Sequence, residues 1–238
     1  MSLAYWGALR LLNQVAGELG LPQYTSVVGV SNVQSVQLLA LLQAAGNELN
    51  LYYPWEHLNK EWSITTVPAT EIYTPPLDFK YATDQTQWDR SNRWPLLGPK
   101  SAQEWAWLKG SLVATLPRMR YRFIGGKMKL FPIPTTTINI TMEYTSGFWV
   151  QTTGNAFTDT VVLDTDILLY DPWLLIKFIK LKFYELKGFS TLSAQADFMR
   201  VFNALTGKDA GASILSLAPV ASSFYIGSHS VPDGSWNV

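Results

Sequence analysis

Two histidines and one pair of closely spaced aspartates are the side chains best suited to chemistry. The histidines are His57 and His229, and the aspartates are Asp164 and Asp166. A catalytic zinc site needs three protein ligands, often in an H-E-x-x-H pattern, and two isolated histidines do not supply them. The aspartates have the right chemistry to share a divalent cation, but they come just before a predicted helix, whose dipole favours nearby carboxylates. We therefore interpret both aspartates as helix-capping, structural residues.

The sequence also lacks the short patterns of nucleophilic and phosphate-binding sites. It has no cysteine, which excludes thiolate nucleophiles, thiolate metal sites and disulfides. The pattern G-x-S-x-G is absent, and Gly126-Lys127 and Gly207-Lys208 lack the upstream glycine of a phosphate loop, so both pairs are interpreted as turns. The residues therefore predict no enzyme activity, no metal and no cofactor. A hydrolase with unrecognised carboxylates is the weakest of the alternatives.

The clearest local pattern is a basic β-hairpin between residues 118 and 131. Two strand-like runs flank Gly125 and Gly126, and a Gly-Gly pair suits a two-residue hairpin turn with positive φ. If Ile124 pairs with Lys127, side-chain alternation gives the hairpin one basic face and one apolar face. The basic face carries Arg118, Arg120, Arg122, Lys127 and Lys129, and the apolar face carries Tyr121, Phe123, Met128 and Leu130.

Five cations on one face need an explanation, because directly opposed like charges destabilise a sheet. Three explanations stay open: a solvated edge that charge protects from aggregation, a contact with acids of a neighbouring subunit, or a contact with DNA phosphate. Between residues 130 and 176 the sequence contains acids but no Lys or Arg. Two alternatives stay open: these acids contact the hairpin of a neighbouring subunit, or they lie near the hairpin of the same chain. These acids are Glu143, Asp159, Asp164, Asp166 and Asp171. Opposite charges on two faces of one chain suit a head-to-tail contact, which closes into a ring by rotation.

Helical patterns flank this hairpin on both sides. Periodicity, caps and stop residues predict helices over about 3–19, 32–52, 101–114, 171–187 and 193–205. The expected caps are Ser31 with Gln34, Ser101 with Glu104, and Asp171 before Pro172, with Gly20 and Gly188 as stops. The 32–52 helix has two apolar faces, which indicates two packing partners. One face contains Leu38, Leu41, Leu42, Ala45 and Leu49, and the other contains Val33, Ala40 and Ala44.

The remaining segments complete the predicted fold. Short Thr-, Tyr- and Trp-rich runs broken by proline predict a β region over about 61–162. Residues 209–238 form a charge-poor tail with several large apolar side chains, so we expect it to dock on a partner. The fold class is α+β, a helical bundle with an inserted small antiparallel β region and an extended C-terminal tail. Residues 1–208 are expected to form a single domain.

The charge composition limits the functions that fit. Lys and Arg number 18 and Asp and Glu also number 18, so the strongly basic balance of a typical DNA-binding domain is missing. Charged residues make up 15% of the chain, against about 25% in most soluble domains, which suggests surfaces covered by other subunits. The N-terminus lacks the charged start of a secretory signal, and Lys177 and Lys180 interrupt the longest apolar run, so we expect a soluble intracellular product without membrane contact.

Three stretches carry a family resemblance. They are WDRSNRWPLLGPKSAQEWAWLKG at 88–110, EYTSGFWV at 143–150, and the block 164–205 that contains DTDILLYDPWLLIKFIKLKFYELKGFS. In this order they resemble the head-to-tail adaptor proteins of tailed bacteriophages, particularly short-tailed ones. The resemblance implies a non-enzymatic ring, usually dodecameric, that lies beneath the portal, extends the DNA channel and carries the next tail component. It implies a helical bundle with inserted β structure, made in the host cytoplasm and located in the virion at the head-to-tail connector.

The resemblance also implies the partners. They are the portal protein, other copies of the chain, a downstream tail protein, and DNA that passes without sequence specificity. Family members reach into the portal with the C-terminal segment, where Phe224, Tyr225 and Trp236 are the expected anchors because aromatic residues dominate binding hot spots. The alternative function is a nucleic-acid-binding module that uses the basic hairpin face with exposed Trp and Tyr as stacking surfaces.

Overall fold

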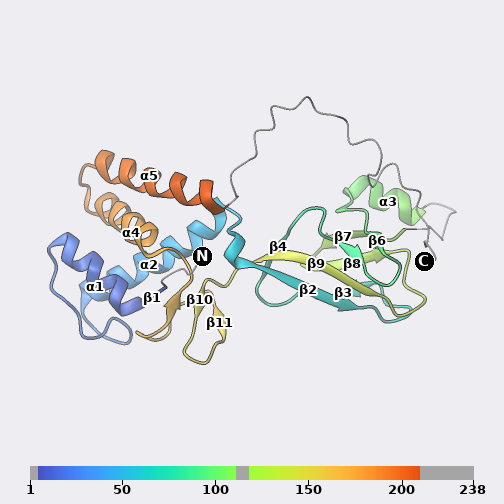
Figure 1. Cartoon of the computed structure of the whole chain (residues 1–238), viewed down its shortest axis with the longest axis horizontal. Coiled ribbons are helices and arrows are strands. Elements are labelled where there is room, and N and C mark those ends of the chain that lie inside the picture. The colour runs from blue at the N-terminus through green and yellow to red at the C-terminus, as the bar shows by residue number, and fades with distance from the viewer. Residues whose placement is uncertain (1–4, 111–117, 210–238) are drawn as a thin grey trace. The chain divides into compact units, whose positions relative to one another are not determined.

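The computed structural model describes residues 5–110 and 118–209, which divide into two compact units (Figure 1). The helical unit is built from the described residues up to Asn59 and from Thr145 onward. The β unit is built from the described residues between Lys60 and Tyr144. Together they contain helices and small antiparallel sheets, which confirms the predicted α+β class. That residues 1–208 work as a single adaptor domain stays a prediction.

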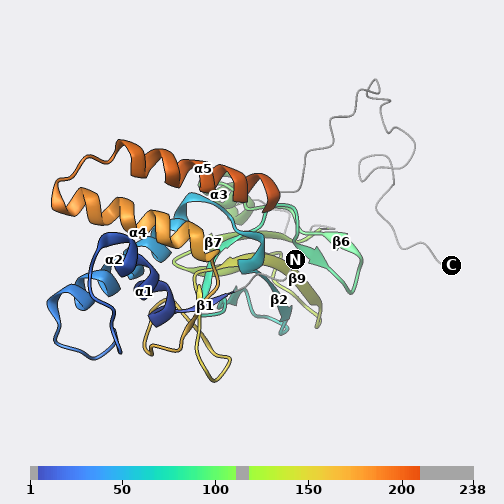
Figure 2. The same ribbon diagram turned by 60° about the vertical axis from the view of Figure 1, so that its left-hand side comes forward.

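Four α-helices make up most of the helical unit. They are α1 (Ala8–Leu19), α2 (Val33–Tyr52), α4 (Pro172–Lys187) and α5 (Leu192–Asp209), with a short 3-10 helix η1 at Glu56–Leu58. Helix α4 is apolar nearly all round, with buried residues on most of its surface, because it packs against the other three helices. Two views show α4 between α5 on one side and α1 with α2 on the other (Figures 1 and 2).

A small sheet belongs to the helical unit. Its strand order is β1 (Trp6–Gly7), β12 (Ile167–Leu168), β10 (Val150–Gln151) and β11 (Phe157–Thr158). All three pairings are antiparallel, and Leu168 lies opposite both Trp6 and Val150. The expected first helix therefore begins at Ala8, because the residues before it pair as a strand.

Capping residues fix the helix ends. Asp171 Oδ1 accepts hydrogen bonds from the N–H groups of Trp173 and Leu174, and Gly188 ends α4 with a φ of 71°, as predicted. The predicted cap at Ser31 is wrong. Asn32 caps α2 instead, and its Oδ1 accepts from the N–H of Gln34 at 2.9 Å.

The β unit contains two small sheets and one helix. The first sheet has the order β2 (Asn59–Thr65), β9 (Asn139–Ser146), β5 (Trp88–Asp89) and β6 (Trp94–Pro95), and β4 (Phe79–Ala82) also pairs with β9. The second has the order β3 (Ile72–Tyr73), β8 (Lys127–Phe131) and β7 (Arg120–Ile124), and the helix is α3 (Ala102–Gly110). The core of the β unit contains Ile64, Leu96, Tyr121, Met128, Leu130, Ile140 and Met142.

Helices α3 and α5 differ in how well their predicted ends agree with the structure. The capping box before α3 is confirmed: Glu104 N–H donates to Ser101 Oγ at 3.2 Å, and Ser101 N–H donates to Glu104 Oε2 at 3.1 Å. The predicted end of this helix lies outside the described residues. Helix α5 continues to Asp209, so Gly207-Lys208 lies inside a helix and the predicted turn there is wrong.

In the described chain no helix is long and apolar enough to cross a membrane.

Candidate assembly interfaces

The basic hairpin has the predicted register. Ile124 pairs with Lys127, Arg122 with Lys129 and Arg120 with Phe131. Both turn glycines have positive φ, 59° at Gly125 and 71° at Gly126, which allows the two-residue turn. The pairing is therefore confirmed, and it places the basic side chains and the apolar side chains on opposite faces of the hairpin.

The apolar face of the hairpin belongs to the core of the β unit. Tyr121, Met128 and Leu130 are fully buried, and Phe123 packs its ring 5.2 Å from that of Phe79. Burial raises the pKa of the Tyr121 hydroxyl, and the charge of Asp84 acts in the same direction. This face anchors the hairpin, so a partner has access only to the other one.

The basic face is partly covered at the end away from the turn. Trp105 of α3 packs against Phe131 with ring centroids 6.3 Å apart, and the Nη1 atom of Arg120 is buried. Arg122 Nη1 donates to the carbonyl of Ser101 at 3.5 Å. The packing of α3 therefore covers this end of the basic face.

The open end of the basic face lies at the turn. Lys127 is exposed, and Arg122 and Lys129 are half-exposed. We call these three residues the basic tip. Arg118 is half-buried. An acid also lies at the edge of this sheet, since Glu71 forms an ion pair of 2.7 Å with Lys109 of α3.

Asp164 and Asp166 hold loops together and do not cap the following helix as predicted. Asp164 Oδ1 accepts from the N–H groups of Val27 and Val28 at 2.9 and 3.0 Å. Burial alone would raise the pKa of Asp164, but these bonds and one from Ser26 outweigh it and lower the pKa. Asp166 is fully buried, and its Oδ2 accepts from two N–H groups of its own loop. Both residues are structural, as expected.

Three of the five acids of the predicted complement bind backbone groups within the chain. Asp164, Asp166 and Asp171 are engaged with backbone N–H groups within the chain. Glu143 on β9 and Asp159 in the loop after β11 have exposed side chains. That the five acids form the complement of a basic face stays a prediction.

Helix α2 has one buried and one exposed apolar face. The inner residues Leu38, Leu42, Ala45 and Leu49 are fully buried, as expected for the first face. On the opposite side Val33 is 81% exposed, Leu51 is 68% exposed, and Val36 and Ala40 are also exposed. We call the outer set the α2 stripe; it consists of Val33, Val36, Ala40, Ala44 and Leu51. The prediction that α2 has a second apolar face is confirmed.

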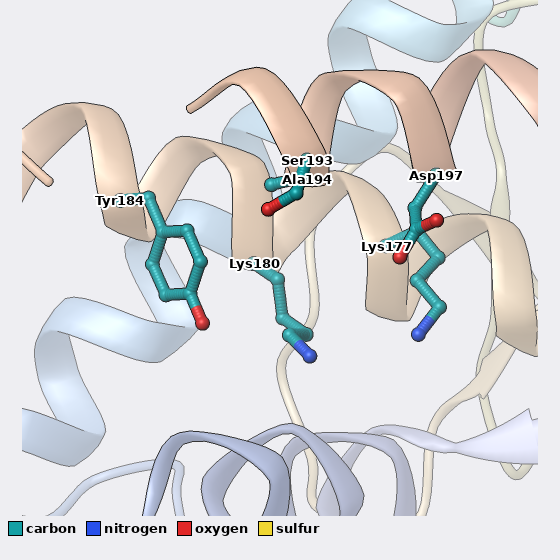
Figure 3. A pocket seen from close by; sticks show the side chains of 6 residues that line it. All are labelled: Lys177, Lys180, Tyr184, Ser193, Ala194 and Asp197. Carbon is teal, nitrogen blue, oxygen red and sulfur yellow. The ribbon is translucent and has the colours of Figure 1, made fainter. Parts of the chain in front are cut away.

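A hollow lies between α4 and α5 (Figure 3). It is lined by Lys177, Lys180, Tyr184, Ser193, Ala194 and Asp197. Lys180 and Lys177 both contact Glu18 Oε2, at 2.7 and 3.5 Å, so the two cations share an acid from α1. Among the described residues, no cluster of three His, Asp or Glu side chains has the arrangement to hold a metal.

The histidines do not form a site in the described structure. His57 is partly buried beside the rings of Trp55 and Tyr170. Burial lowers its pKa, although the charge of Asp209 acts in the opposite direction. His229 and the predicted tail anchors Phe224, Tyr225 and Trp236 lie outside the described residues.

The comparison with known proteins identifies one family. A family model described as "SU10 adaptor protein" matches residues 8–220, which is most of the chain and includes both units. No curated protein matches the chain.

Proposed function

Because the chain belongs to the SU10 adaptor protein family, we propose that it forms a ring beneath the portal of a phage, extends the DNA channel and carries the next tail component. The family is one of phage head-to-tail adaptors, so the chain is a structural virion component and not an enzyme. The family match over residues 8–220 is the observation that carries this proposal.

The zero net charge supports the role of a DNA conduit. Each phosphate that Lys or Arg neutralises strengthens binding to DNA, and a channel must let the duplex slide. With 18 cationic and 18 anionic side chains, the chain has no overall attraction for a polyanion. A free-standing nucleic-acid-binding module, the alternative function, would need a wider basic surface than a tip of three residues.

The basic tip is proposed to contact a neighbouring subunit. Glu143, an exposed acid of the predicted set, is the residue that we assign to it from a second copy. A contact between different surfaces of identical subunits is heterologous, and it gives a ring when the rotation closes. The tip would then set the register of neighbouring subunits.

Reversing the charge of the tip is expected to block ring assembly. We predict that Lys127→Glu with Lys129→Glu lowers the yield of rings on the portal by at least tenfold. Couplings of close interfacial charge pairs reach roughly 1.5 to 7 kcal/mol, and the loss recurs at every joint. Arg120 is left unchanged because part of its side chain is buried. A change there would disturb the fold as well as the charge of the surface. Ring yield is measured by electron microscopy of negatively stained particles.

A matched control separates this effect from net charge. Lys187 and Lys208 are exposed lysines of the helical unit, and reversing both changes the net charge by the same amount. This control should assemble normally. If the tip variant also assembles but binds duplex DNA less tightly, with a weaker salt dependence than wild type, the tip contacts phosphate. If neither property changes, the tip is a solvated edge.

The proposed function itself is tested with the portal protein of the same phage. The chain should co-purify with that portal and appear as an added ring on it. Absence of any complex would contradict the proposal.

A further inference from the structure

Helix α5 has an exposed uncharged face that resembles the α2 stripe. Leu192 is 79% exposed, Met199 is 44% exposed, and Ala196 and Asn203 are exposed. Spacings of three and four residues place all four on one side of the helix. We call this set the α5 stripe. The residues that anchor α5, Ala194 and Phe198, are buried on its other side.

The two stripes face outward on different sides of the helical unit. The Phe198 ring on the inner side of α5 stacks on Phe178 of α4, with centroids 4.5 Å apart. Leu42 and Leu49 on the inner side of α2 belong to the same core as α4. Since α4 lies between α5 and α2 in both views (Figures 1 and 2), the two stripes are directed away from it in different directions.

The α2 stripe is long and free of charged side chains. From Val33 to Leu51 it extends along about 27 Å of helix at 1.5 Å per residue. It contains no charged residue, and charge depletion is what distinguishes the core of an interface from the rest of a surface. The small side chains of Ala40 and Ala44 leave room at its centre for a larger side chain.

The loop after β11 widens this surface. Gln43 of α2 donates to the carbonyl of Asp159 and accepts from the N–H of Val161 at 3.1 Å. These bonds hold the loop beside the helix, where Val162 and Leu163 are exposed. The same loop places the exposed acid Asp159 at the border of the α2 stripe.

The borders of the two stripes carry opposite charges. Asp159 lies beside the α2 stripe, and Arg200 follows Met199 at the border of the α5 stripe with a side chain that is 78% exposed. Arg200 contacts Asp197 at 3.3 Å, but an exposed pair of this kind is weak enough for another acid to compete. Two different uncharged faces with opposite border charges suit a contact between identical chains.

We infer that the α2 stripe of one subunit binds the α5 stripe of the next, with Met199 seated between Ala40 and Ala44 and Arg200 near Asp159. This inference rests on the proposed ring and names the surfaces that join its subunits. Small residues let the two helices approach closely, and the flexible thioether of Met199 packs over these two alanines. The contact is heterologous, so each subunit uses both stripes at once.

Cysteine cross-linking tests this pairing, and the natural chain has no cysteine to interfere. Met199→Cys is combined with Ala44→Cys, and separately with Ala40→Cys, so that a shift of one helical turn is covered. The double variants are assembled on the portal, oxidised mildly and run on a denaturing gel without reductant. We expect a ladder of covalent oligomers up to the complete ring from at least one of them, because each copy forms two bonds.

Controls distinguish the possible contacts. A mixture of the Ala44→Cys and Met199→Cys single variants should give dimers and nothing larger. Combining Met199→Cys with Gln14→Cys, an exposed position on α1, should give no ladder. Efficient dimers from Ala44→Cys alone would show a symmetric α2 contact and overturn the inference.

The outcome also separates this inference from the proposed function. If rings form on the portal but neither double variant gives more cross-linked product than the Gln14 control, the stripe pairing is wrong and the adaptor function stands. If wild-type protein forms no ring with the portal, the proposed function fails, and the inference fails with it.

Discussion

Replacing Gly46 by alanine is expected to destabilise the helical unit by about 2 to 3 kcal/mol. Gly46 lies in the middle of α2 against the indole ring of Trp149, and an added Cβ would overlap the ring atoms. The ring cannot move away easily, because Trp149 is fully buried and its Nε1 donates to Asn47 at 2.8 Å. The midpoint of urea unfolding, followed by Trp fluorescence, measures the effect.

Gly207 provides a control with the opposite sign. It lies in α5, and a Cβ there would meet no other atom within 4 Å. Alanine is favoured over glycine in a helix by about 1 kcal/mol, so Gly207→Ala should be neutral or slightly stabilising. If both variants shift the midpoint equally, the close packing of α2 on Trp149 is incorrect.

Removing all residues after Asp209 is expected to abolish portal binding and leave the fold intact. Phe224, Tyr225 and Trp236 are the proposed anchors, and truncation of a hot-spot aromatic costs about 2 kcal/mol or more. Loss of three such residues should weaken binding more than a hundredfold. Keeping Asp209 preserves the hydrogen bond that its Oδ2 accepts from Glu56 N–H at 2.9 Å, so α5 should stay in place.

Two measurements check the truncation. Circular dichroism and thermal unfolding should match wild type, and surface plasmon resonance on immobilised portal should show no binding. A full-length variant with the three anchors changed to alanine should behave like the truncated one. Unchanged portal affinity in both variants would remove the tail from the mechanism.

Local features of the fold could be predicted from the sequence. The Gly125-Gly126 turn determines the hairpin register, because a two-residue loop leaves one pairing that matches the alternation of apolar side chains. Asp171 before Pro172 and Gly188 mark both ends of α4. At α2 two neighbouring residues, Ser31 and Asn32, both have the side chains of a cap, so a pattern alone does not choose between them.

Features that depend on distant contacts could not be predicted in this way. The carboxylate of Asp164 binds N–H groups more than a hundred residues earlier in the chain. The sequence shows only that Asp164 comes shortly before α4, and this position predicted a helix cap. Trp105 of α3 packs against Phe131 of the hairpin, and nothing in the sequence of α3 indicates this contact. The close contact at Gly46 could have been predicted, because glycine is unfavourable inside a helix and its presence there indicates tight packing.

Of the two stripes proposed to join the subunits, only the α2 stripe could be predicted from the sequence. The second apolar face of α2 follows from helical spacing, and the exposure of Val33, Ala40 and Leu51 agrees with it. The α5 stripe was missed because alanine, asparagine and one methionine do not stand out as an apolar face. Its uncharged character becomes clear only once the buried side of α5 is known.

The mass of the complex between the chain and its portal protein tests the central claim most directly. Native mass spectrometry is applied to the chain alone, the portal alone and their mixture. We expect a monomer or small oligomer for the chain alone, and in the mixture a single species with a complete ring of copies bound to one portal. A mixture that retains only the masses of its separate components would contradict the adaptor function. A stable ring from the chain alone would show that assembly needs no template.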